Sequence, residues 1–253
     1  MDPSKLKVSK LRVLCDGNRL SGEVVVPPDP RGVVLLLHGL PSAQHPAHPD
    51  DLGYSGVAHT FADHGYAAAW FDMRGKDGKG FFSLEGWVRD ARAALDSART
   101  GDGLASLPLA LVGASAGGAI AVQAARRGAP VKAIVLWAAP AEWVSISKDP
   151  RESVRRISEM TGMPIAPDVI EDPSGWHAEF PMNSVEKAVT VVRVPILVVH
   201  SLDDDIVPVA HADRIVAAAP NAECRLLEGQ GHQLRRSSEA IQTSLDWLGR
   251  RLR

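Results

Sequence analysis

The sequence predicts a single α/β domain built on a mostly parallel β-sheet of eight strands flanked by helices. Short apolar runs alternate along the chain with longer stretches of helical period, which is typical of parallel strands joined by helices. The run Val33–Leu37 is apolar at every position, as expected for a strand buried on both faces. The 253 residues suffice for one sizeable core, and single α/β domains commonly reach this length, so residues 1–253 are taken as one domain.

Eight segments have the character of β-strands. In chain order, the predicted strands are Lys7–Cys15, Leu20–Val26, Val33–Leu37, Tyr66–Phe71, Leu107–Gly113, Val131–Trp137, Val194–His200 and Glu223–Leu227. The first two are expected to form a hairpin, because Asp16-Gly17-Asn18 between them is a tight-turn sequence.

Four segments have helical period. The predicted helices cover residues 51–64, 83–99, 116–127 and 238–252. The last helix carries an apolar stripe at a 4-3-4 spacing that should pack on the sheet, formed by Ile241, Leu245, Leu248 and Leu252.

Residues 141–192 interrupt the alternation of strands and helices. This segment follows the sixth predicted strand and contains five prolines together with Trp143 and Trp176. We expect one to three short helices here, lying over the strand ends as a small lid within the same domain.

Charge and hydropathy exclude several kinds of partner. The chain has 28 basic and 30 acidic residues, so it has no broad basic field to bind nucleic acid or an anionic membrane. No apolar run approaches the roughly 20 residues that span a bilayer, and the charged start, Met1–Lys7, is unlike a signal peptide. Cys15 and Cys224 are far apart, which predicts reduced packing residues in a cytoplasmic protein. We expect a monomer or homodimer.

The segment Gly113-Ala114-Ser115-Ala116-Gly117 lies between a predicted buried strand and an alanine-rich helix. A nucleophilic serine must project from a sharp, strained turn, and small neighbours leave room for that turn. Ser115 would also lie at a helix N-terminus, where free N–H groups and the helix dipole favour developing negative charge. The alternative is an ordinary strand–helix turn in which Ser115 caps the helix.

A serine nucleophile needs a base and an acid that orients the base. His232 follows the last predicted strand, so it should reach the edge of the sheet where Ser115 lies, because loops after parallel strands emerge at one edge. The acid should come from the loop after Val194–His200, which contains Asp203, Asp204 and Asp205. Spacing alone leaves the choice among these three open.

Five short motifs occur in a familiar order. They are H-G at His38-Gly39, D-x-R-G at Asp72–Gly75, G-x-S-x-G around Ser115, D-x-x-V-P at Asp204–Pro208 and G-x-G-H ending at His232. Over nearly the whole chain, the sequence therefore resembles the α/β-hydrolase-fold serine hydrolases, in the branch of carboxylesterases and serine aminopeptidases. In similar enzymes the acid begins the D-x-x-V-P motif, so the resemblance implies a triad of Ser115, Asp204 and His232, with Asp203 or Asp205 as the alternative acid.

Two backbone N–H groups are the expected donors of an oxyanion hole. One belongs to Ala116, the residue after the nucleophile. The second should come from the loop after His38-Gly39. Pro41 has no N–H, so Leu40 is the candidate, which matches the position that similar enzymes use.

Several other residues have two interpretations. Trp137, Trp143 and Trp176 are candidate substrate-binding residues, with core packing as the alternative for each. Arg74 is expected to stabilise a turn by pairing with a carboxylate or a backbone oxygen.

The proline-rich loop at residues 41–51 could suggest a metal site. Its candidate ligands are His45, His48, Asp50 and Asp51. Three prolines in nine residues limit its reorganisation, so a loop that shapes the substrate entrance is the preferred interpretation and no metal is expected.

The expected function is hydrolysis of a small-molecule carboxylic ester with a small or medium acyl group, through an acyl-enzyme and without a cofactor. A peptidase, amidase or thioesterase on the same triad is the alternative within this class. A non-catalytic ligand-binding protein on a hydrolase scaffold is the alternative from another class.

Overall fold

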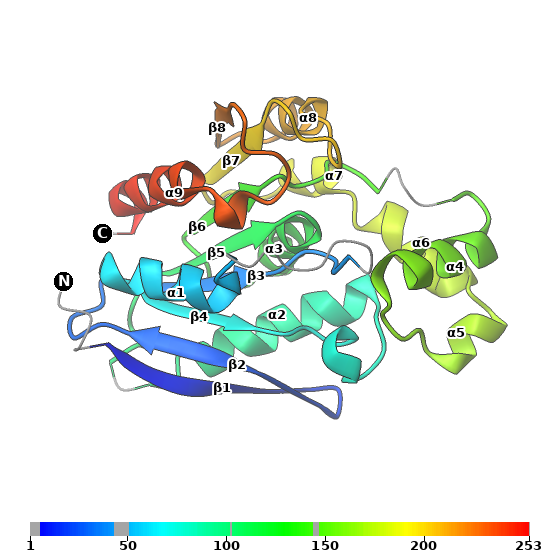
Figure 1. Cartoon of the computed structure of the whole chain (residues 1–253), viewed down its shortest axis with the longest axis horizontal. Coiled ribbons are helices and arrows are strands. Elements are labelled where there is room, and N and C mark those ends of the chain that lie inside the picture. Colours follow the sequence, from blue (N-terminus) through cyan, green and yellow to red (C-terminus); the bar gives the residue numbers. More distant parts are fainter. Residues whose placement is uncertain (1–5, 43–50, 102, 144–146, 253) are drawn as a thin grey trace.

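One eight-stranded sheet runs through the protein, in the computed structural model described here for residues 6–42, 51–101, 103–143 and 147–252 (Figure 1). The strands lie in the order β1-β2-β4-β3-β5-β6-β7-β8. Their bounds are β1 Lys7–Cys15, β2 Asn18–Val26, β3 Val33–Leu37, β4 Ala67–Phe71, β5 Leu109–Ala114, β6 Ala133–Trp137, β7 Ile196–Ser201 and β8 Ala222–Leu227. Only the β1–β2 and β2–β4 pairings are antiparallel, so the predicted mostly parallel eight-stranded sheet is confirmed.

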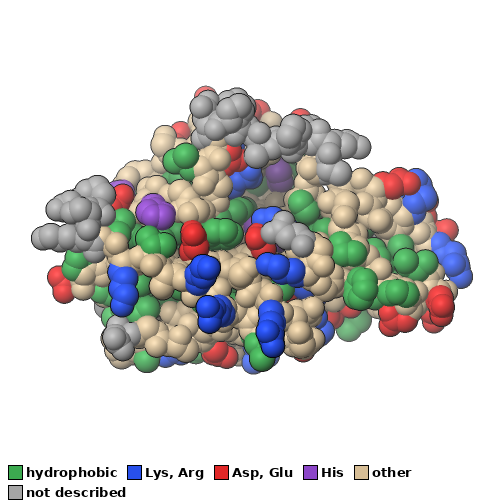
Figure 2. All heavy atoms as spheres, turned by 60° about the horizontal axis from the view of Figure 1, so that its bottom comes forward, with side chains coloured by type: hydrophobic (Ala, Val, Ile, Leu, Met, Phe, Trp, Pro, Cys, Tyr) green, Lys and Arg blue, Asp and Glu red, His purple; other side chains and the backbone are tan. Residues whose placement is uncertain are grey.

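The first hairpin turns where the sequence predicts it. Asp16 and Gly17 both have positive φ, at 49° and 76°, which suits the twist of two antiparallel strands joined by two residues. β1 is an edge strand that exposes Lys7, Lys10 and Arg12, and Figure 2 shows Lys and Arg side chains gathered on the face that includes this edge. Charges on an edge strand oppose pairing with another chain.

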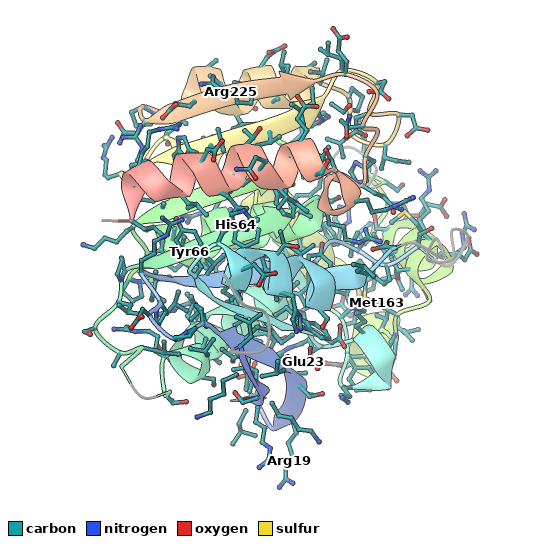
Figure 3. All side chains as sticks on the ribbon, turned by 60° about the vertical axis from the view of Figure 1, so that its left-hand side comes forward. Arg19, Glu23, His64, Tyr66, Met163 and Arg225 are labelled. Carbon is teal, nitrogen blue, oxygen red and sulfur yellow. The ribbon has the colours of Figure 1, made fainter. Side chains whose placement is uncertain are left out.

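Two helical layers cover the sheet. One layer consists of α1 (Gly53–Asp63) and α9 (Ser238–Arg251), which lie side by side across one face in Figure 3. The other consists chiefly of α2 (Leu84–Ala98), α3 (Ala116–Arg126) and α8 (Ala210–Ala218). The residues of β3 alternate between the two cores beneath these layers, which explains why the whole strand is apolar.

Helix α8 was not predicted from the sequence. It has nine residues, no side-chain hydrogen bond caps its first turn, and it buries only His211, Ala212 and Ile215. Its apolar pattern is therefore too short to stand out from a loop, and its packing on β7 and β8 stabilises it as a helix.

The segment 141–192 contains more helix than expected. Four helices lie in its described part, namely α4 Pro150–Thr161, α5 Pro167–Glu171, α6 Ser174–Met182 and α7 Val185–Val189. Helices α4–α6 pack on one another at one end of the molecule, whereas α7 packs on α3 and α8 (Figure 1). None of the helices in the described ranges has both the length and the apolar character required to cross a membrane.

Candidate active site

Ser115 lies in a sharp turn between β5 and α3. Its backbone has φ 50° and ψ −123°, in the region of positive φ that residues with a Cβ rarely adopt. A conformation of this kind costs about 1–3 kcal/mol and persists only where the surroundings enforce it. The Ser115 N–H donates to the Trp137 carbonyl at 2.7 Å, and the Gly118 N–H donates to the Ser115 carbonyl at 2.9 Å. The turn therefore holds a half-buried serine in a strained, well-defined position.

Small residues allow this turn because the backbone segments around it nearly touch. A Cβ at Gly117 would lie 2.3 Å from the Leu37 carbonyl oxygen, and one at Gly113 would lie 2.3 Å from the Gly117 carbonyl oxygen. A Cβ at Gly39, after β3, would lie 2.9 Å from the Ser115 Cβ. The glycines on either side of Ser115 are thus steric requirements, as the sequence predicts, and the loop after β3 lies directly against the serine.

His232 and Asp204 form a hydrogen-bonded pair. The His232 Nδ1 lies 2.8 Å from Asp204 Oδ2 and 3.0 Å from Oδ1. The Asp204 side chain is fully buried, while that of His232 is 18% exposed. Since an ionised carboxylate only accepts, Nδ1 carries the hydrogen and the other ring nitrogen is left as an acceptor.

The structure distinguishes the three aspartates of this loop. Asp204 Oδ1 also accepts from the Ile206 N–H at 2.9 Å and the Val207 N–H at 2.8 Å. Asp203 and Asp205 are exposed at the surface. Of the three aspartates, Asp204 is therefore the one that the structure pairs with His232.

A second histidine, His200, contacts the same carboxylate. Its Nε2 donates to the Val207 carbonyl at 2.7 Å and lies 3.3 Å from Asp204 Oδ2. Burial by itself raises the pKa of the Asp204 carboxyl, but hydrogen bonds from His200, His232 and the Val207 N–H outweigh burial and hold that pKa well below its usual range. Sequence reasoning missed His200, and its only signal was a polar residue at the end of an otherwise apolar strand.

His38 secures the loop after β3. Its Nδ1 donates to the Gly39 carbonyl at 2.7 Å, and its Nε2 accepts from the Met73 N–H at 3.0 Å. Within the described residues, the N–H groups of Leu40 and Ala116 have no hydrogen-bond partner. Ala116 directly follows Ser115, and Leu40 follows Gly39, where a Cβ would lie 2.9 Å from that of Ser115.

The candidate site residues share one edge of the sheet. Strands β3, β5, β7 and β8 are mutually parallel, so their carboxyl ends lie along the same edge. Ser115 follows β5, Asp204 follows β7 and His232 follows β8, while Leu40 follows β3.

The structure corrects the expectation for Trp137. This side chain has no exposed surface, and its indole N–H donates to the Ser244 Oγ of α9 at 2.9 Å. Trp137 alternates with Leu136 along β6 and so faces the core beneath α1 and α9, not a substrate pocket.

Trp143 and Trp176 both pack on Phe180 within the insertion. Their ring centroids lie 5.5 Å and 4.8 Å from that of Phe180. Trp176 also donates to the Phe82 carbonyl at 3.1 Å and borders a hollow of about 430 Å³, whose lining includes neither Ser115 nor His232. Both tryptophans therefore stabilise the insertion, and their contact with a substrate stays a prediction.

Arg74 has the structural role that the sequence predicts. Its guanidinium lies 2.6 Å from the fully buried Asp90 carboxylate, and its carbonyl accepts from the Trp87 indole N–H at 2.7 Å. The loop His45–Asp50 lies outside the described residues. Asp51, the last candidate ligand in that region, accepts from the Gly53 N–H and pairs with Arg235.

Comparisons with known proteins identify the family of this chain. The family profile of serine aminopeptidase, S33, matches residues 28–167, which include Ser115 but end before Asp204 and His232. No curated protein matches the chain.

Solved structures match almost the whole chain at low identity. An alpha/beta hydrolase, GrgF, from Penicillium has 15% identity and a TM-score of 0.73 over 97% of this chain and 99% of its own. An esterase of Pyrococcus furiosus has 16% identity and a TM-score of 0.69 over 100% and 95%, and Est1E from Butyrivibrio proteoclasticus has 18% and 0.68 over 96% and 98%. With the family profile covering more than half of its length, the chain belongs to the serine aminopeptidase S33 family and is a hydrolase of the α/β type.

Proposed function

We propose that the protein hydrolyses carboxylic esters of small or medium acyl groups through an acyl-enzyme formed on Ser115. The observation that carries the proposal is the hydrogen-bonded Asp204–His232 pair, at the same sheet edge as the strained serine turn. With Nδ1 committed to the carboxylate, the other ring nitrogen of His232 is an acceptor for the serine proton.

The proposed reaction has two stages. His232 takes the proton of Ser115 as the serine oxygen attacks the ester carbonyl, and Asp204 stabilises the charged imidazole. His232 then gives the proton to the departing alcohol, which leaves an acyl-enzyme. Water attacks this ester in the same way and releases the acid. Because the pKa of Asp204 is held low, its carboxylate is ionised throughout the neutral pH range.

The N–H groups of Leu40 and Ala116 are proposed to bind the oxyanion. Both are unpartnered within the described residues, and removing one such donor typically costs about 3–4 kcal/mol of transition-state stabilisation. His38 supports this role because it holds the Gly39 carbonyl and thereby orients the loop that carries Leu40.

Two of the structural neighbours support an ester substrate. One is an esterase of Pyrococcus furiosus, and Est1E from Butyrivibrio proteoclasticus has been solved with ferulic acid bound. The name of the family supports the main alternative, a peptidase or amidase on the same residues, and a thioesterase would use the same chemistry. We further propose that α4–α6 act as a small lid and that the protein works in the cytoplasm.

A substrate panel separates these activities. p-Nitrophenyl esters of increasing acyl length, acyl thioesters and aminoacyl anilides would be compared by kcat/KM on the same enzyme preparation. The proposal expects the highest values for short or medium esters. A higher value for the anilides would replace the esterase proposal with a peptidase.

Ser115→Ala tests whether the protein is a catalyst at all. It should lose nearly all hydrolysis and all labelling by a fluorophosphonate probe, while Ser97→Ala, at a hydroxyl that bonds within α2, should keep both. Full activity of Ser115→Ala would refute the triad. Ligand binding by a wild-type protein that the probe never labels would instead support a non-catalytic binding protein.

A further inference from the structure

The turn that carries His232 lacks the steric support that holds Ser115. Gly229 and Gly231 have φ 68° and 58°, and among the described residues a Cβ at either position would have no neighbour within 4 Å. A Gly-Gln-Gly segment in open space has wide conformational freedom before it folds. Hydrogen bonds must therefore fix its conformation.

Ser201 supplies one of these bonds from the end of β7. This side chain is fully buried, and its Oγ accepts from the Gln230 N–H at 3.2 Å. The same hydroxyl donates to Asp203 Oδ1 at 2.5 Å. Ser201 thus connects the backbone of the histidine turn to a carboxylate on the neighbouring loop.

Asp203 is linked to this turn through Ser201. The Ser201 hydroxyl is the main reason why the pKa of the Asp203 carboxyl lies below its usual value, and the backbone of Gly231 and Gly229 acts in the same direction against the effect of burial. The hydrogen bond to the turn is that between the Gln230 N–H and Ser201, and Asp203 accepts from the same Ser201 hydroxyl.

We propose that Asp203, together with Ser201, is a positioning residue for His232. By holding residues 229–231, the two side chains keep the imidazole paired with Asp204 and directed at Ser115. This inference rests on the proposed function only for its effect on rate, because the conformational stability of the turn can be measured without a substrate.

The adjacent Asp205 provides a matched control. It is an aspartate of the same loop, also exposed, and the described part of the chain shows no side-chain hydrogen bond or ion pair for it. Asp203→Ala should lower kcat between about tenfold and a hundredfold with KM changed less than about twofold, since small misplacements of a catalytic group have costs of this size. Asp205→Ala should stay within about twofold of the wild type in both parameters.

Two further variants test the mechanism of the loss. Asp203→Asn retains a side-chain oxygen for Ser201 and the turn, so it should recover part of the rate. Ser201→Ala should also lower kcat, and the double variant Ser201→Ala/Asp203→Ala should lose less than the product of the two single losses, because both residues act through the same turn. Fully multiplicative losses would overturn the joint role.

Amide hydrogen exchange separates this inference from the proposed function. In Asp203→Ala, exchange should accelerate at residues 229–232 and not in α3, whereas Asp205→Ala should match the wild type. Unchanged exchange and unchanged kcat in Asp203→Ala would overturn the inference. The proposed hydrolase activity is tested separately, by Ser115→Ala. Where Asp203→Ala fails to fold, the same comparison is made with Asp203→Asn.

Discussion

The serine turn and the histidine turn are fixed by opposite means. Around Ser115, backbone segments approach so closely that glycines at positions 113 and 117 leave no space for a methyl group. Before His232, no described residue crowds a Cβ at positions 229 or 231, and the Gln230 N–H donates to Ser201, whose hydroxyl donates to Asp203. Steric packing thus fixes the serine turn, whereas we propose that hydrogen bonding fixes the histidine turn.

The largest effect is expected at the pair formed by Asp204 and His232. Asp204→Asn should lower kcat on the order of 10⁴-fold, because an amide no longer selects the Nδ1–H tautomer of His232 or stabilises its charged form. Steady-state kinetics would measure the loss, and Asp205→Asn should remain near the wild type. A rate within tenfold of the wild type would mean that another carboxylate serves as the acid.

At the serine turn, Gly117→Ala should destabilise the whole fold. Its Cβ would lie 2.3 Å from the Leu37 carbonyl oxygen and 2.5 Å from that of His38, so the backbone must shift. We expect the free energy of unfolding to fall by about 3 kcal/mol, with activity lost in the folded fraction. Urea denaturation measures the change. The control is Gly175→Ala in α6, where a Cβ meets none of the described atoms within 4 Å. This substitution should stabilise the helix by about 0.5–1 kcal/mol.

Gly231→Ala sharpens the contrast with Gly117→Ala. Space is available at this position, so the cost is that of a positive φ in a residue with a Cβ, about 1 kcal/mol in the free energy of unfolding. The value of kcat should also fall, by more than the loss of folded protein accounts for, because the residue immediately precedes His232. Equal destabilisation by Gly231→Ala and Gly117→Ala would contradict the distinction between the two turns.

As the pH falls, the histidine turn should be weakened before the serine turn. The pKa values of Asp203 and Asp204 are lowered in the folded protein, so their contribution to stability is present above the pKa of the unfolded chain and declines as pH falls below about 4. Urea denaturation between pH 7 and pH 3 should therefore show a steeper loss for the wild type than for Asp204→Asn. Parallel curves would show that this carboxylate does not contribute.

Local patterns predicted most of the architecture. Each predicted strand lies within a residue or a few of the observed one, because apolar runs and the Asp16–Gly17 turn express preferences of a few neighbouring residues. The sequence patterns missed helix α8 and predicted fewer than the four helices observed in the insertion. These helices are short and gain their stability from tertiary packing, which local patterns do not reveal. Trp137 illustrates the same limit, since alternation along β6 indicates its face only once α9 is known to cover that face.

By itself, the sequence determined the sheet, the serine turn and the chain order of Ser115, Asp204 and His232. These depend on apolar periodicity and on the small residues that a tight turn demands, both of which are visible in short segments. Only the tertiary structure decided how the three adjacent aspartates divide their roles and that His200 joins Asp204. Which aspartate pairs with His232 depends on burial and on a hydrogen bond between residues 28 positions apart in the sequence. Three adjacent aspartates are chemically identical, so only their different surroundings in the folded protein distinguish them.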